Sequence, residues 1–161
     1  MRPYLVTKNA RSLFYATTGL RRSEGLSPRK DDIDFEMRCV EAKHNTRIKR
    51  AGVTFYNGEC ETYLKKYLLS RRDNDPKLFR IGYRQFQTIW QKASKAAGFG
   101  ITPQVLKKCH STELGELLVP DRFIDVFQGR APRTVLAKHY TGKGLDWSRR
   151  IYEKACLKLL D

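Results

Sequence analysis

The 161-residue sequence lacks the features that mark a membrane-bound, secreted or disulfide-bonded protein. Its longest apolar runs span only a few residues, as in 117–120, which excludes a transmembrane helix. The N-terminus opens with Arg2-Pro3 and then alternates polar with apolar residues, unlike a signal peptide. The four cysteines, at positions 39, 60, 109 and 156, lie far apart and form no Cys-x-x-Cys pair. We therefore expect reduced, mostly buried thiols in a cytoplasmic protein, without a disulfide framework or a zinc site.

The common motifs of nucleotide-, metal- and serine-dependent enzymes are missing as well. The sequence contains no GxxxxGK(S/T) phosphate loop, no GxGxxG fingerprint, no HExxH and no GxSxG elbow. Its three histidines, at positions 44, 110 and 139, are too scattered to form a set of metal ligands. Glu113 and Glu116 share a predicted helix, where surface ion pairing with Lys107 and Lys108 explains them more simply than catalysis. Any chemistry is therefore expected to need neither a metal nor a nucleotide cofactor.

Basic charge is what the sequence has in excess. Lys and Arg number 32 against 17 Asp and Glu, which gives a formal net charge of +15. Basic pairs occur along the whole chain and are not confined to one tail: Arg21-Arg22, Lys65-Lys66, Arg71-Arg72, Lys107-Lys108 and Arg149-Arg150. A folded domain with this charge repels itself unless a polyanion is near, so nucleic acid is the first partner to consider. The alternative is a ribosome-associated or thermally adapted domain with a solvated basic surface.

The hydrophobic pattern predicts one domain over residues 1–161 that is mainly helical. Helical spacing of apolar residues occurs over 3–18, 22–26, 60–68, 86–97, 103–118, 121–127, 131–139 and 147–160. Strict alternation from Ile33 to Cys39 predicts a strand, residues 44–47 can turn the chain, and Ile48 to Phe55 can return as a second strand. Most aromatic residues fall on the helical stripes and are expected in the core. The fold class is therefore α+β, mainly helical, with a small β-hairpin or three-stranded sheet.

Two stretches of the chain resemble conserved boxes of the tyrosine recombinases, or phage integrases. Residues 16–27 contain TGLRRSE, and with Asp32-Ile33-Asp34 after them they resemble the first box of this family. Residues 128–140, QGRAPRTVLAKHY, resemble its last box in the form used by archaeal integrases of the fusellovirus type, from viruses or plasmids. The resemblance covers most of the chain and implies the catalytic-domain fold. Because the chain begins almost at the first box, the family's N-terminal DNA-clamping domain is expected to be absent.

The resemblance also implies a catalytic set and a reaction. Tyr140 would attack the scissile DNA phosphate, giving a 3′-phosphotyrosyl link and a free 5′-hydroxyl. Arg21 and Arg130 would hold the non-bridging oxygens, for which their planar forks are suited. Lys49 would protonate the leaving 5′-oxygen as general acid, and Lys43 across the same predicted turn is the alternative. The implied partners are double-stranded DNA and, at synapsis, further copies of the chain in a tetramer, with no cofactor because one phosphodiester is exchanged for another.

One box departs from the family's usual His-x-x-Arg or Lys-x-x-Arg. The matching residues here are Gln104 and Lys107. Glutamine can hydrogen-bond a phosphate oxygen but cannot shuttle a proton, and lysine keeps the charge without the bidentate grip of arginine. We expect Lys107 to belong to the catalytic set, Gln104 and Lys108 to contact DNA, and cleavage to be reduced but real.

Three other functions fit parts of the sequence. A cleavage-impaired DNA-binding relative of the integrases would explain Gln104 and Lys107. A type IB topoisomerase fragment would use the same chemistry. A basic RNA- or ribosome-binding domain would require the box matches to be coincidental.

Overall fold

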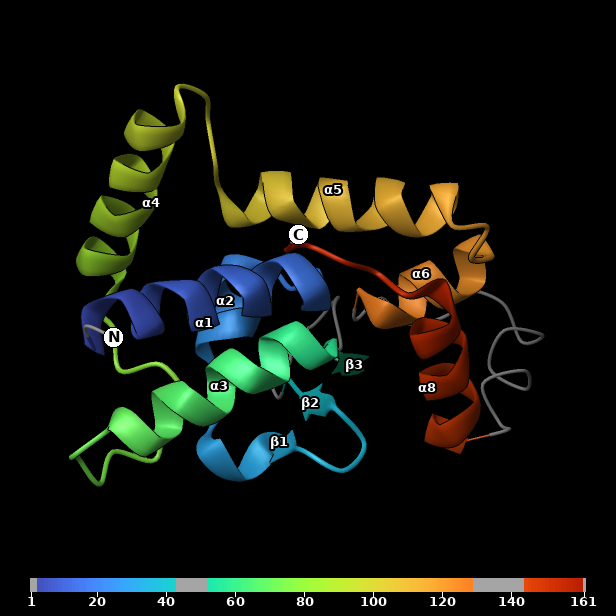
Figure 1. The fold of residues 1–161 in the computed structure, drawn as a ribbon, viewed down its shortest axis with the longest axis horizontal. Coiled ribbons are helices and arrows are strands. Elements are labelled where there is room, and N and C mark those ends of the chain that lie inside the picture. The colour runs from blue at the N-terminus through green and yellow to red at the C-terminus, as the bar shows by residue number, and fades with distance from the viewer. Residues whose placement is uncertain (1–2, 43–51, 129–143, 161) are drawn as a thin grey trace.

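A computed structural model of the chain describes residues 3–42, 52–128 and 144–160. Helices make up most of these residues, and three short strands form one small sheet (Figure 1). The helices are α1 (Pro3–Thr18), α2 (Arg22–Leu26), the 3-10 helix η1 (Lys30–Asp32), α3 (Gly58–Ser70), α4 (Tyr83–Ala97), α5 (Pro103–Glu116), α6 (Asp121–Phe127) and α8 (Gly144–Ala155). The strands are β1 (Ile33–Asp34), β2 (Cys39–Glu41) and β3 (Val53–Phe55). The predicted α+β, mainly helical fold is confirmed.

Helix α1 lies in the middle of the molecule, in contact with α5 on one side and α3 on the other (Figure 1). Its apolar residues Ala10, Leu13 and Phe14 recur at helical spacing and are all buried. The helix ends where Gly19 takes a φ of +59°, a left-handed conformation that a residue without a Cβ adopts at little cost. Both the extent of this helix and its terminating glycine were predictable from the sequence.

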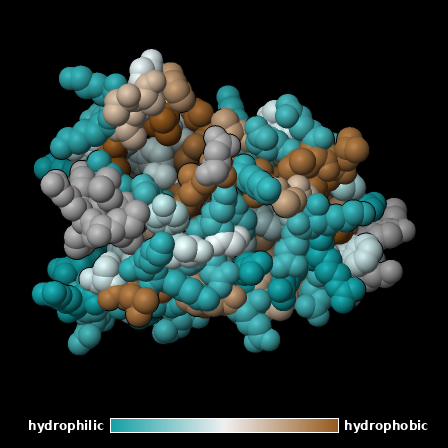
Figure 2. All heavy atoms as spheres, viewed as in Figure 1, coloured by the Kyte–Doolittle hydropathy of each residue, from teal (hydrophilic) through white to brown (hydrophobic). Residues whose placement is uncertain are grey.

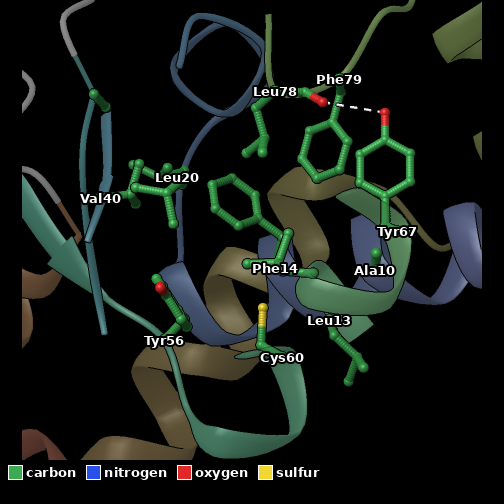
Figure 3. Close-up of a cluster of buried hydrophobic side chains, with 13 residues drawn as sticks. Ala10, Leu13, Phe14, Leu20, Val40, Tyr56, Cys60, Tyr67, Leu78 and Phe79 are labelled. Atoms are coloured by element: carbon green, nitrogen blue, oxygen red, sulfur yellow. Dashed lines mark hydrogen bonds between the residues drawn. The ribbon is translucent and has the colours of Figure 1, made fainter. Parts of the chain in front are cut away.

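The main core gathers around Phe14 between α1, α3 and the segment before α4 (Figure 3). The ring of Phe79 meets that of Phe14 edge-on, with centroids 5.3 Å apart. The Tyr67 hydroxyl donates to the carbonyl oxygen of Leu78 at 3.1 Å, so this tyrosine is buried without losing its polar partner. The expectation that most aromatic residues lie in the core is confirmed.

The sheet differs from the predicted strands. Its order is β1-β2-β3, both pairs antiparallel, with Ile33 opposite Val40 and Val40 opposite Thr54. The single strand predicted from Ile33 to Cys39 is wrong, because the chain turns back within it. The Asp34 side chain accepts the Met37 N–H at 2.8 Å and Arg38 has a φ of +50°, so β1 and β2 pair with each other. The predicted turn at 44–47 and the start of the second strand lie outside the described residues.

The other predicted helices are present with small shifts at their ends, apart from 131–139, which lies outside the described residues. Thr102 caps α5 by accepting the Val105 N–H on its side chain, and Pro103 occupies the first turn, as expected. The prediction for the last helix is wrong at its C-terminal end. Helix α8 stops at Ala155 because Cys156 takes a φ of +52°, and residues 157–160 follow without regular secondary structure. Its buried side includes Tyr152, whereas Trp147 is exposed.

The surface is polar and the thiols are unpaired. Hydrophilic residues cover most of the face drawn in Figure 2. Cys39 and Cys60 are buried and Cys109 and Cys156 are exposed, all as free thiols. The predicted absence of disulfides is thus confirmed for these residues, while only half of the cysteines are buried. Among the described helices, none combines the length and the hydropathy that a membrane span requires.

Candidate active site

Arg21 lies in the turn between α1 and α2, where one buried carboxylate fixes both its backbone and its side chain. The Glu24 carboxylate accepts the Arg21 backbone N–H at 2.7 Å and an Nη1 hydrogen at 2.8 Å. Glu24 is 4% exposed, whereas the Arg21 side chain is 29% exposed. A guanidinium has five N–H donors, so Arg21 retains donors for an anion while the Glu24 carboxylate holds the side chain in position.

Close packing explains a glycine of the same segment. A Cβ at Gly25 would lie 2.4 Å from the ring of Tyr15, so only glycine fits against this residue. The Tyr15 hydroxyl donates to the Arg22 carbonyl at 2.9 Å and ties α2 to α1. The contacts of Glu24 and Tyr15 with residues 21–22 therefore hold Arg21 in one position.

Lys107 projects from α5 into the protein beneath this turn. It is 3% exposed, and its Nζ donates to the carbonyl oxygens of Gly19 at 2.7 Å and Gln128 at 3.0 Å. The expected surface ion pairing of Lys107 with the glutamates of its helix is therefore wrong, because its side chain points to the opposite side. Gln104 and Lys108 are both exposed on α5, which leaves them accessible for contact with DNA.

Gln128 and His110 complete the buried surroundings of Lys107. The Gln128 side-chain amide donates to the Lys107 carbonyl at 2.9 Å and lies 3.5 Å from Nδ1 of His110. His110 is buried and its ring stacks on Tyr152, with centroids 6.4 Å apart. Burial, and after it the charge of Lys107, lowers the pKa of His110 to about 4. This histidine is therefore neutral near pH 7 and does not act as a cation there.

Thr54 on β3 bonds to the same two parts of the chain. It is fully buried, and its hydroxyl lies within hydrogen-bonding distance of the carbonyl oxygens of Thr18, at 3.0 Å, and Phe127. These carbonyls come directly before those of Gly19 and Gln128 in the chain. The end of α1 and the end of α6 are thus joined at consecutive residues.

The structure places only part of the expected catalytic set. It brings Lys107 and the turn of Arg21 together, and it puts Gln104 on the same helix as Lys107. Lys49, its alternative Lys43, Arg130 and Tyr140 lie outside the described residues.

Four residues of the site had no assigned role in the sequence: Glu24, Thr54, His110 and Gln128. Glu24 stands three residues after Arg21, a spacing that favours a capping contact, and so its role could have been found. The other three meet only in the folded chain. Within the described part, no group of three or more His, Cys, Asp or Glu residues could hold a metal ion.

The profile of the "Phage integrase family" matches residues 4–143. The chain belongs to that family. The matched span includes every residue of the two segments that carried the resemblance, 16–27 and 128–140. It also includes Gln104 and Lys107.

The fold of this chain is also similar to that of a solved structure, XerA recombinase. The two share 22% sequence identity with a TM-score of 0.66. The comparison covers 96% of this chain but only 58% of the XerA chain. The likeness establishes that this chain has the fold of the matched part of that recombinase. A search of curated proteins finds no match.

Proposed function

We propose that these residues form the catalytic domain of a site-specific DNA recombinase that cuts and rejoins strands through a 3′-phosphotyrosyl intermediate at Tyr140. The observation that supports this most is the way Glu24 and Lys107 hold the turn of Arg21 while the Arg21 side chain stays partly exposed. One edge of the guanidinium is held by the ion pair with Glu24, and the donors left over on its exposed part suit the oxygens of a phosphate diester. Membership of the phage integrase family and the net charge of +15 agree with a DNA substrate.

In the proposed reaction, the Tyr140 oxygen forms a bond to the scissile phosphorus and the bond from phosphorus to the 5′-oxygen breaks. The proton of the phenol passes to solvent water, and the Lys49 ammonium gives a proton to the departing 5′-oxygen. Arg21 and Arg130 stabilise the charge on the non-bridging oxygens of the transition state. Attack by a 5′-hydroxyl of another strand reverses the step, so neither ATP nor a metal takes part.

Cations around the reacting tyrosine have a second task. The unperturbed pKa of a tyrosine is about 10, so a phenol is a weak nucleophile near pH 7. Nearby positive charges favour the phenolate and thereby assist the attack. Gln104 and Lys108, exposed on α5, are proposed to contact the DNA backbone beside the scissile phosphate.

Within the family, we propose that the chain belongs to the archaeal fusellovirus type, because residues 128–140 resemble the last box in the form used by those integrases. The proposed working state is a tetramer on two DNA duplexes inside the cell, the arrangement that strand exchange between two sites requires.

The test is capture of a covalent protein–DNA complex. The protein is incubated with a pool of nicked duplexes of random sequence, then denatured in SDS, and the DNA that stays attached is sequenced. We expect an attached species of shared sequence from the wild type and none from Tyr140→Phe.

The outcomes separate the candidate functions. Salt-sensitive gel shifts by both proteins without any adduct would instead establish a DNA-binding relative that does not cleave. An adduct of equal yield from Tyr140→Phe would contradict the assignment of the nucleophile. Relaxation of supercoiled plasmid without exchange between duplexes would indicate a topoisomerase.

A further inference from the structure

Two buried side chains join the end of α1 to the end of α6. The Thr54 hydroxyl faces the carbonyls of Thr18 and Phe127, and the Lys107 ammonium donates to those of Gly19 and Gln128. We call these contacts the double bridge. Neither side chain belongs to α1 or α6: Thr54 lies on β3 and Lys107 on α5. The double bridge therefore holds the end of α1 against the end of α6, although positions 19 and 128 are 109 residues apart in the sequence.

The two segments lead directly into the proposed phosphate ligands. Gly19 stands two residues before Arg21, and Gln128 stands two residues before Arg130. Both guanidiniums have to meet the same phosphate, and a shift of about 1 Å in a catalytic group can cost about 100-fold in rate. A bond between the end of α1 and the end of α6 is therefore a direct way to fix the turn that carries Arg21.

Lys107 is poorly placed to bind the phosphate itself. Only 3% of the residue is exposed, and two of the three ammonium hydrogens are used by the carbonyls of Gly19 and Gln128. Gln128 returns a hydrogen bond from its side chain to the Lys107 carbonyl, so the contact is reciprocal. Moving the ammonium to an external anion would leave buried carbonyl oxygens without a donor, which is costly.

We infer that Thr54 and Lys107 are positioning residues that hold the start of the Arg21 turn against the end of α6, and that Lys107 acts through the Arg21 turn and not as a phosphate ligand. This inference rests on the proposed cleavage function. It assigns a role to Thr54, and it changes the role of the lysine that replaces the family's usual arginine.

Thr54 is tested by removing only its hydroxyl. Thr54→Val keeps the shape of the side chain, Thr54→Ser keeps the hydroxyl, and Thr62→Val is the matched control. Thr62 also donates to a backbone carbonyl, that of Gly58 at 2.9 Å, but it is exposed on α3 away from the site. Single-turnover cleavage and DNA affinity are measured on a nicked suicide duplex that carries the sequence recovered by covalent capture.

We expect Thr54→Val to cut at least about tenfold more slowly, with DNA affinity within about twofold of the wild type. Thr54→Ser should recover most of the rate, and Thr62→Val should match the wild type. Unchanged cleavage by Thr54→Val, or an equal loss in Thr54→Ser, would overturn the role of the hydroxyl. Urea unfolding of each variant shows that the compared proteins are folded under the assay conditions.

Lys107 is tested with a scissile methylphosphonate, in which a methyl group replaces one charged oxygen. A residue that neutralises this oxygen is needed less on the uncharged substrate, whereas a positioning residue is needed equally on both. We expect Arg21→Ala to recover about tenfold or more relative to wild type on the methylphosphonate, and Lys107→Met to recover less than about threefold. Lys65→Met, which removes an exposed lysine of α3, is the control.

Two results would overturn the inference for Lys107. One is recovery of Lys107→Met as large as that of Arg21→Ala, which would make it a phosphate ligand. The other is wild-type cleavage by Lys107→Met on the phosphodiester. If the wild type itself forms no Tyr140-dependent adduct, the proposed cleavage function is refuted, and the inference that rests on it is refuted with it. A wild-type adduct with unaffected variants refutes the double bridge alone.

Discussion

The Nδ1 atom of His110 lies 2.7 Å from the position that a Cβ at Gly19 would occupy. The residue that ends α1 thus rests directly on a buried ring of α5. Lys107 bonds to the carbonyl of the same glycine from one turn earlier on α5. The start of the Arg21 turn is therefore shaped by what α5 presents to it, and a change at either residue is expected to reach the site.

Gly19→Ala should be strongly destabilising. The new Cβ would meet the His110 ring, and the φ of +59° disfavours any residue with a Cβ. We expect a loss of about 3 kcal/mol or more in the free energy of unfolding. Gly98→Ala is the matched control, since Gly98 has a φ of +77° with open space around it. It should lose only about 1 kcal/mol, the cost of the backbone conformation. Equal losses in urea unfolding would show that the contact with His110 contributes nothing.

Stability should fall as the pH drops from 7 to 5, because of His110. Burial and the charge of Lys107 lower its pKa from 6.5 to about 4, so the unfolded chain takes up a proton in this range and the folded chain does not. The stabilising effect of the neutral ring is complete above pH 6.5 and is lost progressively as the pH falls toward 4. We expect a decrease of about 2 kcal/mol between pH 7 and pH 5.

The control for this prediction is His110→Gln, which removes the titrating ring and leaves the other two histidines in place. Its free energy of unfolding, measured by urea at both pH values, should change much less over the same range. An equally steep decrease in the variant would assign the effect to other groups.

Local patterns predicted the helices and the Arg21 turn well. The stripe in α1, the terminating Gly19 and the cap at Thr102 all act within a few neighbouring residues, and each is present. Local patterns failed where one residue reverses the chain. Arg38 and Cys156 both take positive φ values, and neither residue type predicts this conformation.

The supporting residues of the site were beyond prediction for a different reason. Thr54 occupies an ordinary position of a strand, and its importance comes from Thr18 and Phe127, which are far away in the sequence. Similarly, the sequence predicted Lys107 both as an ion-pair partner on the helix surface and as a member of the catalytic set, and only the fold brings two carbonyl oxygens to its ammonium group. Contacts between distant segments depend on the packing of several elements, which hydrophobic periodicity alone does not specify.

Lys107→Arg should not raise the yield of covalent complex, even though it restores the residue usual in the family. The larger, planar guanidinium has to fit where an ammonium now lies between the carbonyls of Gly19 and Gln128. We expect lower stability and about two- to tenfold less adduct on the nicked substrate. Lys65→Arg, an exposed change on α3, controls for the substitution itself. A higher yield from Lys107→Arg would mean that the protein lacks a third arginine on the phosphate, beside Arg21 and Arg130.

The last segment of the chain is held by the start of α3. Glu59 accepts the backbone N–H groups of Leu159 and Leu160 at 3.0 and 3.1 Å, and the Asn57 amide donates to the Leu157 carbonyl at 2.9 Å. Burial acts to raise the pKa of Glu59, but the hydrogen bonds from Leu159, Asn57 and Leu160 outweigh it, so the pKa is lowered. The carboxylate form is thus the one that binds the segment.

Acid or Glu59→Gln should therefore release residues 157–160 from α3. A lowered pKa in the folded protein means that the stabilisation is present above the ordinary value of 4.5 and is lost as the pH falls through the lowered one. At neutral pH, Glu59→Gln leaves a single weaker acceptor for two N–H groups, so amide hydrogen exchange at Leu159 and Leu160 should speed up by about threefold or more. Glu113→Gln, on the exposed side of α5, should leave those rates unchanged. If Glu59→Gln exchanges like the wild type, the segment is held by the packing of Leu157, which is 5% exposed, and not by the carboxylate.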